Sequence, residues 1–229
     1  MMHVSVILLA GGTGSRMQSE MPKQYMEFAD KPIILHSLDL FLMMPEVKEI
    51  IIVCDPAYET LFNKLYHLKI RFALPGHRRQ DSLYNGFQLI NAKSNLVCVH
   101  DAARPLITES LVRRVITMAD KYGAATVGMP IKFTVKEVDS DNLVKNTPDR
   151  SRIWEIQTPQ VIRPPLLKKG FEIANQKELT VSDDVSLVEL TGHPVKVVEG
   201  SHSNIKITTP EDFKMAECLQ KSLNPTCAL

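Results

Sequence analysis

Two cations follow a cluster of glycines near the start of the chain. The segment GGTGSRMQSEMPKQY places Gly11, Gly12 and Gly14 after an apolar run, then Arg16, then Lys23 beyond a proline. Glycines after a strand let backbone amides approach a phosphate, because no side chain blocks them and positive φ angles cost little. Arginine suits phosphate oxygens as a planar fork, and lysine suits them as a compact charge. The segment therefore indicates a polyphosphate site. On this segment alone, two solvated surface cations remain an equal alternative.

The glycine loop lacks the features of two common nucleotide-binding motifs. It has no Gly-Lys-Ser/Thr ending of a Walker A loop, and its glycines do not have the GxGxxG spacing. Both a P-loop nucleotidase and a dinucleotide-binding enzyme are therefore disfavoured.

One carboxylate could hold a divalent cation. Asp101, in VHDAARP, follows an apolar run at a predicted strand end, where a hard oxygen ligand can join a metal to a phosphate. An isolated Asp at such a place is more often a cap. The seven histidines form no HExxH motif, and the four cysteines form no CxxC pair. We expect reduced thiols and neither a disulfide framework nor a zinc site.

Alternating strand and helix patterns must position these groups. Three runs rich in β-branched residues, at residues 3–10, 47–54 and 94–101, are typical of strands buried on both faces of a parallel sheet. Residues 34–44 and 81–92 have apolar positions at helical spacing. The order predicts an α/β fold, a mostly parallel sheet with helices on both faces, whose ligands bind beyond the carboxyl ends of the strands. Both GGTGSR and HDAARP fall at such ends.

Three further elements are expected in the second half of the chain. Residues 131–149 alternate apolar and polar residues around DSDN, which predicts a protruding β-hairpin arm that contacts another subunit. One helix is predicted to be capped by Ser182 and closed by Gly192. Another has Thr209 as its cap and Pro210 at its first position.

Length and charge limit the classes of protein. A chain of 229 residues can form one domain with a substantial core, and we expect a single domain over residues 1–229. Its 27 Lys and Arg against 26 Asp and Glu leave a net charge of +1, so no nucleic acid or membrane partner is expected. The apolar run VSVILLA is too short to span a bilayer, and we expect a soluble, cytoplasmic protein.

Several motifs together resemble one enzyme family. LLAGGTGSRMQSEMPKQY is similar to the nucleotidyltransferase signature of the sugar-phosphate cytidylyltransferases, and so are PGHRRQDSLYNG, VHDAARP, DRSRIWEIQTPQ, SDDVSLVE and NIKITTPEDF. The resemblance runs from about residue 4 to about residue 220 and is strongest to the enzymes that act on 2-C-methyl-D-erythritol 4-phosphate. It implies a Rossmann-like nucleotide-diphospho-sugar transferase fold and a step of non-mevalonate isoprenoid synthesis.

The resemblance implies a reaction and a set of nucleotide-binding residues. In the family, a methylerythritol phosphate oxygen attacks the α-phosphorus of CTP and pyrophosphate leaves, with no covalent enzyme intermediate. Arg16 and Lys23 would stabilise the charge that develops on the triphosphate, and Asp101 would hold Mg²⁺. The nucleotide, with its cytosine, would lie against Ala10, Gly11, Gly12, Gly14, Gly76 and Ser82.

The acceptor is implied to bind between two subunits. Arg104 and Lys206 would contact methylerythritol phosphate, while Thr134 and Arg150 would come from the arm of the neighbouring chain in a homodimer. The chain departs from the family pattern at Phe133, where an Asp usually precedes the threonine, and at His77 in the base-recognising loop.

Parts of the sequence are also compatible with two other functions. Ribitol-5-phosphate cytidylyltransferases share the glycine loop and the NIKITTP segment, but HDAARP and DRSRIWEIQTPQ favour the methylerythritol enzymes. A non-catalytic nucleotide-binding regulatory subunit would be expected to lose a cation or the metal carboxylate. Since Arg16, Lys23, Asp101 and Lys206 are all present, an enzyme is favoured.

Overall fold

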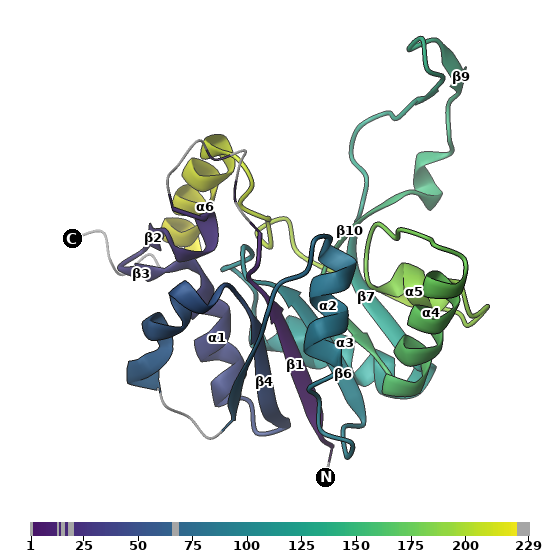
Figure 1. Cartoon of the computed structure of the whole chain (residues 1–229). Coiled ribbons are helices and arrows are strands. Elements are labelled where there is room, and N and C mark those ends of the chain that lie inside the picture. Colours follow the sequence, from purple (N-terminus) through teal and green to yellow (C-terminus); the bar gives the residue numbers. More distant parts are fainter. Residues whose placement is uncertain (1, 13, 15–16, 18–20, 66–68, 224–229) are drawn as a thin grey trace.

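A seven-stranded sheet forms the centre of the molecule (Figure 1). The computed structural model describes residues 2–12, 14, 17, 21–65 and 69–223. Across the sheet the strands are β11 (Lys196–Glu199), β7 (Ala124–Pro130), β10 (Trp154–Ile162), β6 (Leu96–Asp101), β1 (Val4–Leu9), β4 (Val47–Val53) and β5 (Ile70–Ala73). In this sheet β10 pairs antiparallel with β6 and β7, and the other pairs are parallel, which confirms the predicted mostly parallel α/β fold.

Helices cover both faces of the sheet, as predicted. The α-helices are α1 (Ile33–Met43), α2 (Arg79–Phe87), α3 (Glu109–Tyr122), α4 (Pro164–Gln176), α5 (Val185–Glu189) and α6 (Pro210–Leu223). The 3₁₀ segments given in full by the described residues are η2 (Lys23–Tyr25), η3 (Pro56–Leu65) and η4 (Arg150–Arg152). The small strand pairs are β2 (Glu27–Phe28) with β3 (Lys31–Pro32) and β8 (Glu137–Val138) with β9 (Val144–Asn146).

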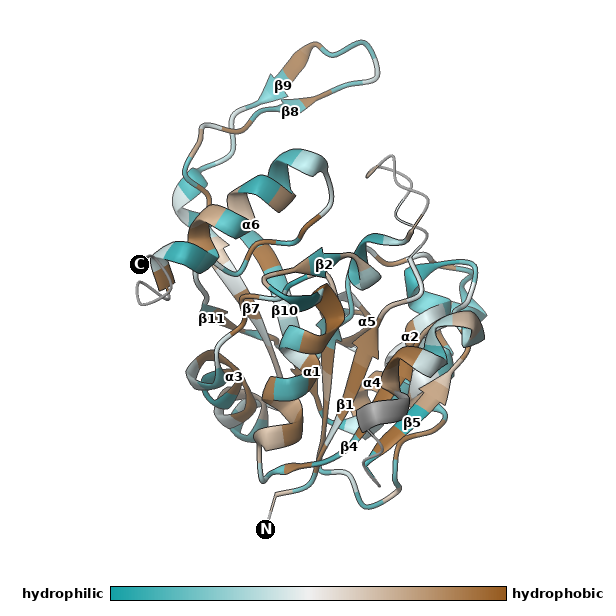
Figure 2. Cartoon of the chain, turned by 90° about the vertical axis from the view of Figure 1, so that its left-hand side faces the viewer, coloured by the Kyte–Doolittle hydropathy of each residue, from teal (hydrophilic) through white to brown (hydrophobic). Residues whose placement is uncertain are grey.

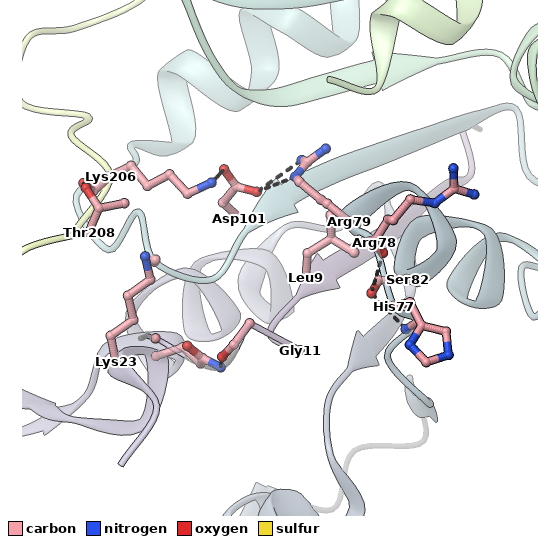
Figure 3. Close-up of a pocket in the computed structure, with 15 residues that line it drawn as sticks. Leu9, Gly11, Lys23, His77, Arg78, Arg79, Ser82, Asp101, Lys206 and Thr208 are labelled. Atoms are coloured by element: carbon pink, nitrogen blue, oxygen red, sulfur yellow. Dashed lines mark hydrogen bonds and ion pairs between the residues drawn. The ribbon is translucent and has the colours of Figure 1, made fainter. Parts of the chain in front are cut away.

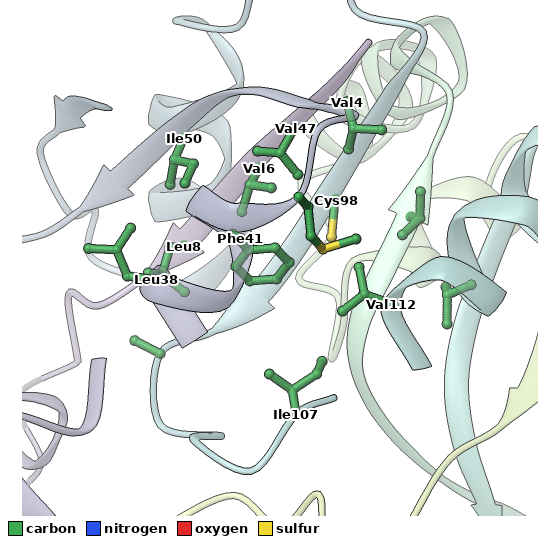
Figure 4. Packing of buried hydrophobic residues seen from close by; sticks show 14 of the residues in the cluster. Val4, Val6, Leu8, Leu38, Phe41, Val47, Ile50, Cys98, Ile107 and Val112 are labelled. Carbon is green, nitrogen blue, oxygen red and sulfur yellow. The ribbon is translucent and has the colours of Figure 1, made fainter. Parts of the chain in front are cut away.

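The alternation of side chains along each strand divides the core into two layers. Val6 and Leu8 of β1 pack with Leu38 and Phe41 of α1 and with residues of α3 (Figure 4). Ile7, between them, faces the opposite layer, which contains side chains of α2, α4 and α5. A sheet that is covered by helices on both sides needs apolar side chains on both of its faces. Figure 2 shows this as strands coloured brown, for hydrophobic residues, through the centre of the molecule.

Strand order places a topological switch beside β1. The chain passes from β1 to β4 and β5 on one side, then returns to β6 on the other side of β1. The connections therefore diverge at the carboxyl ends of β1 and β6, and such a switch point leaves a crevice for a ligand. The glycine loop follows β1, and Asp101 ends β6.

The predicted hairpin is present and projects from the body (Figures 1 and 2). Between β8 and β9, the Asp139 carboxylate accepts hydrogen bonds from the amides of Asp141, at 3.0 Å, and Leu143, at 2.9 Å. This Asx-type turn explains why DSDN ends one strand and begins the next.

Helix ends agree with the sequence in one case and differ in another. The Thr209 hydroxyl accepts from the amide of Asp212 at 3.3 Å, which confirms that cap. The predicted Ser182 cap is wrong, because α5 begins after Asp184, and the Asp183 carboxylate accepts from the Ser186 amide instead.

Helix α2 also differs from the prediction, since it spans Arg79–Phe87 rather than residues 81–92. None of the helices in the described part of the chain combines the length and apolarity needed to cross a bilayer.

Gly170 allows α4 to pack closely against α5. A Cβ atom at this position would lie 2.7 Å from the carbonyl carbon of Leu187 and overlap its oxygen. We therefore expect Gly170→Ala to lower the free energy of unfolding by about 1–3 kcal/mol, the usual cost of overpacking. Urea unfolding measures this, with Lys169→Ala on the exposed face of α4 as the control. Equal stability of both variants would contradict close packing at Gly170.

Candidate active site

A pocket of about 400 Å³ opens at the carboxyl ends of β1 and β6 (Figure 3). Eight predicted residues line it: Gly11, Gly12, Gly14, Lys23, Gly76, Ser82, Asp101 and Lys206. They come from four separate segments of the chain, so the fold brings together groups that were identified only as separate motifs. Arg16 lies outside the described residues.

Polar side chains that follow Pro22 hold the backbone of the glycine loop. The Gln24 amide donates to the carbonyls of Ala10, at 2.6 Å, and Gly12, at 2.8 Å. The Tyr25 hydroxyl donates to the Ala10 carbonyl at 3.0 Å, and its ring stacks on Tyr58 with centroids 3.9 Å apart. Ala10 itself is buried and supports the loop rather than lining the pocket.

Two of the glycines meet a steric or conformational requirement. A Cβ atom at Gly11 would overlap the Pro75 ring, and Gly14 has a φ of +70° in the left-handed region. A larger residue at either position would move the loop or strain it.

The loop between β5 and α2, which contains Gly76, is ordered by hydrogen bonds to the first turn of α2. The Gly76 amide donates to the Ser82 hydroxyl at 2.9 Å, and this hydroxyl lies 3.2 Å from the Arg78 carbonyl, to which it donates. The Asp81 carboxylate accepts from the Arg78 amide at 3.0 Å. These bonds present Gly76 and Ser82 to the pocket.

Asp101 lies among three cations. Its Oδ2 is 2.8 Å from Lys206 Nζ and 3.7 Å from Arg104 Nε, and its Oδ1 accepts from Arg79 at 3.0 Å. Burial acts to raise the pKa of Asp101, but attraction to Arg79, Lys206 and Arg104 overcomes it and holds the pKa below its ordinary value. Lys206 and Arg79 reach the carboxylate from opposite sides in Figure 3.

Arg79 joins two buried carboxylates. Besides Asp101, its guanidinium donates two hydrogen bonds to Asp184, which is 1 % exposed. Burial works against the charge of Arg79, yet the attraction of Asp184 and Asp101 raises its pKa above the ordinary value. The arginine therefore stays charged.

Lys206 is positioned by the segment before α6. The Ile207 amide donates to the Ala103 carbonyl at 2.9 Å, and Ile207 is wholly buried. The Asn204 carbonyl accepts from Arg104 at 2.7 Å. Arg104 is thus buried beside Asp101 and is not among the residues that line the pocket.

Two predicted acceptor residues lie outside the pocket. Thr134 and Arg150 are exposed on the arm segment, and Arg150 donates to the Lys132 carbonyl at 3.3 Å. A single chain therefore does not bring these two side chains to Asp101.

Sequence reasoning missed part of the site. The additional lining residues are Leu9, Gln24, His77, Arg78, Arg79, Ala103 and Thr208. The sequence signal for Arg79 is its position at the start of a helix, two residues before Asp81 and directly after the loop that contains Gly76.

Among the described residues that line the pocket, Asp101 is the one carboxylate that could bind a metal. Among the described residues, no group of three His, Cys, Asp or Glu side chains could hold an ion. Asp101 alone still fits Mg²⁺, which commonly binds one or two carboxylates and takes its other ligands from water and substrate phosphates.

Comparisons with known proteins agree over nearly the whole chain. The family model for 2-C-methyl-D-erythritol 4-phosphate cytidylyltransferase (IspD) matches residues 4–222. A chloroplastic protein of that name from Oryza sativa subsp. japonica is 52% identical over 219 residues, which are 94% of this chain and 74% of the rice protein. One from Desulforamulus reducens is 40% identical over 231 residues, covering 98% and 99% of the two chains.

Solved structures show the same fold. The crystal structure of 4-diphosphocytidyl-2C-methyl-D-erythritol synthase from Anaerococcus prevotii is 32% identical, covers 96% of both chains and has a TM-score of 0.86. The structure of 2-C-methyl-D-erythritol 4-phosphate cytidylyltransferase from Francisella tularensis is 32% identical, with a TM-score of 0.80 over 95% of this chain and 99% of that one.

His100, beside Asp101, makes stability depend on pH. Burial lowers the pKa of this wholly buried side chain from 6.5 to about 4. The unfolded chain therefore binds a proton that the folded chain does not, and the free energy of unfolding falls as the pH drops from 6.5 to 4. This single group accounts for a loss of up to about 3 kcal/mol.

Urea unfolding of the protein and of His100→Gln, at pH 7.5 and 4.5 in metal-free buffer, measures the effect. We expect the stability of the variant to fall less between the two pH values. Parallel losses would exclude His100 as the source.

Proposed function

This chain belongs to the 2-C-methyl-D-erythritol 4-phosphate cytidylyltransferase family, and from that premise we propose that it transfers CMP from CTP to 2-C-methyl-D-erythritol 4-phosphate. The products are pyrophosphate and 4-diphosphocytidyl-2-C-methyl-D-erythritol, an intermediate of non-mevalonate isoprenoid synthesis. One observation supports this most directly: a glycine loop, Lys23, Lys206 and Asp101 line a single pocket at the switch point of the sheet.

The proposed reaction exchanges one phosphorus–oxygen bond for another. A phosphate oxygen of the acceptor forms a bond to the α-phosphorus of CTP, and the bond from that phosphorus to the β-phosphate oxygen breaks. Pyrophosphate leaves with the electron pair and takes on negative charge. Lys23 and Arg16 are proposed to stabilise this charge, since cations fixed beforehand need no reorganisation during the reaction.

The base and the triphosphate are proposed to lie on the two glycine-containing loops. Gly11, Gly12 and Gly14 offer close backbone approach to the phosphates, and Ala10 fixes the loop from below. Gly76 lies on the loop before α2 and Ser82 lies in the first turn of α2, and their hydrogen bond sets the shape of the proposed cytosine site.

Asp101 is proposed to hold Mg²⁺. When bound, the ion would neutralise phosphate charge and make the α-phosphorus more electrophilic. In the structure both carboxylate oxygens contact cations, which keep Asp101 ionised, and a metal bound at Oδ2 would take the place of Lys206.

The acceptor site is proposed to be completed by a second chain. Lys206 would orient the acceptor from this chain, whereas Thr134 and Arg150 would come from the arm of the partner in a homodimer. Arg104 would act from beside Asp101. The exposed positions of Thr134 and Arg150, away from the pocket, support an assembly in which they serve another site.

The alternatives are less well supported. The proteins compared above are named for methylerythritol phosphate rather than ribitol phosphate, and Lys23, Asp101 and Lys206 together in one pocket argue against a regulatory subunit without turnover. A cytoplasmic location stays a prediction, because the rice relative is named as chloroplastic.

Pyrophosphate release from CTP and Mg²⁺ tests the function. The purified protein is given methylerythritol 4-phosphate or ribitol 5-phosphate, and we expect release with the first acceptor. Release with ribitol phosphate alone would reassign the acceptor, and no release with either would favour the regulatory alternative. Omission of Mg²⁺ with added EDTA should abolish the signal.

Lys23→Ala removes one cation from the proposed triphosphate site. We expect kcat to fall by roughly a hundredfold or more, the scale seen when one preorganised donor is lost. Steady-state kinetics measure this, and Lys31→Ala serves as the control because Lys31 pairs with Asp39 outside the pocket. Unchanged turnover would remove Lys23 from the mechanism.

Arg150→Ala tests whether the arm serves a neighbouring site. We expect the variant to lose use of the acceptor while CTP binding, measured by calorimetry, stays nearly intact. If the arm acts across a dimer, mixing inactive Arg150→Ala and Lys23→Ala chains creates one intact site per mixed dimer. Random exchange then restores about a quarter of wild-type activity. No recovery under conditions where subunits exchange would contradict the shared site.

A further inference from the structure

Asp184 is a buried carboxylate that the reaction as proposed does not use. It is 1 % exposed and does not line the pocket, so it cannot contact a ligand there. A buried charge is costly unless it is paired, and the partner here is Arg79, which does line the pocket. Any effect of Asp184 on the site must therefore pass through Arg79.

Arg79 binds two carboxylates with one planar group. Its Nη2 donates to Asp184 Oδ2 at 2.9 Å and to Asp101 Oδ1 at 3.0 Å, while Nε also approaches Asp101 Oδ1 at 3.2 Å. Nη1 completes the pair with Asp184. A guanidinium can make all these bonds in fixed directions, whereas a lysine ammonium is a single point charge on a flexible stem.

This contact fixes which way Asp101 faces. With Oδ1 held by Arg79, Oδ2 lies on the side of Lys206, 2.8 Å from its amino group. Rotation of the carboxylate would break the bonds to Arg79. Arg79 thus selects one orientation of the group that is proposed to bind the metal.

Asp184 is itself held rigidly by β10. The amides of Asp184 and Val185 both donate to Gln160 Oε1, at 2.8 and 2.9 Å. On the same strand, the Thr158 hydroxyl accepts from the amide of Asp101 at 3.1 Å. One strand therefore sets the distance between the two carboxylates that Arg79 spans.

We propose that Asp184 is a positioning residue, which holds the Arg79 guanidinium so that Asp101 keeps the orientation needed to bind Mg²⁺ with the triphosphate of CTP. This inference rests on the proposed function. The ion pair of Asp184 with Arg79 would then serve to orient Asp101, and not only to stabilise the fold.

Asp184→Asn tests the proposal with three measurements. Thermal unfolding checks the fold, calorimetry of CTP binding at a series of Mg²⁺ concentrations without acceptor reports the metal site, and steady-state kinetics separate kcat from KM. We expect about 10- to 100-fold losses in apparent Mg²⁺ affinity and in kcat, the scale for residues that orient a metal ligand. Glu189→Gln, which removes an exposed carboxylate from the helix that Asp184 precedes, is the matched control and should behave as wild type.

Arg79→Lys separates geometry from charge. It keeps the cation but loses the fork, so we expect a loss of Mg²⁺ affinity similar to that of Asp184→Asn. If Asp184 acts through Arg79, adding Asp184→Asn to Arg79→Lys changes the affinity by less than about twofold. Losses that multiply in the double variant would overturn the proposal, as would an unchanged Mg²⁺ dependence in Asp184→Asn.

The proposal can still be tested if Asp184→Asn does not fold or if the wild-type protein is inactive. Should Asp184→Asn not fold, an unchanged Mg²⁺ dependence in Arg79→Lys alone overturns the proposal. A wild-type protein that transfers no CMP contradicts the proposed function, whereas an active wild type with an unaffected Asp184→Asn contradicts only the role of Asp184.

Discussion

The ionised carboxylate of Asp101, buried among cations, is the interaction on which the site depends. Removing a carboxylate from water is costly, and here Arg79, Lys206 and Arg104 offset that cost at 3.0, 2.8 and 3.7 Å. With Asp184 included, two carboxylates face three cations, so the cluster keeps a positive charge. A chain with a net charge of only +1 therefore presents a locally cationic pocket, as the binding of a triphosphate requires.

The antiparallel strand β10 makes this cluster possible. Its pairing with β7 shifts register between Gln157 and Gln160, and the side chains at this irregularity bind other segments rather than simply filling the core. Gln157 accepts from Asn204 at 3.0 Å, Thr158 binds the end of β6, and Gln160 binds the start of α5. One strand thus sets the positions of the segments that carry Lys206, Asp101 and Asp184.

Local sequence was sufficient to predict some parts of the site and not others. The strand before Gly11, the run that ends at Asp101 and the cap at Thr209 are encoded within a few residues, so their patterns identified them. Arg79 and Asp184 could not be paired in this way, because they are 105 positions apart and come together only in the folded chain. The cap predicted at Ser182 was wrong because a residue distant in sequence provides the cap. The Gln160 side chain accepts hydrogen bonds from the amides of Asp184 and Val185 at the start of α5.

The arm shows how a departure from the family pattern can fit the proposed assembly. A two-stranded hairpin is marginally stable by itself, and this one leaves large apolar side chains exposed, with Phe133 at 77%, Leu143 at 65% and Val144 at 60%. Exposure of such an apolar surface to water is unfavourable, and a second chain packed against the arm would cover it. Phe133, where an Asp is usual, then adds apolar contact area beside Thr134. The same contact that stabilises the arm would carry Thr134 and Arg150 to the neighbouring pocket, so in the proposed dimer folding of the arm and completion of the site are one event.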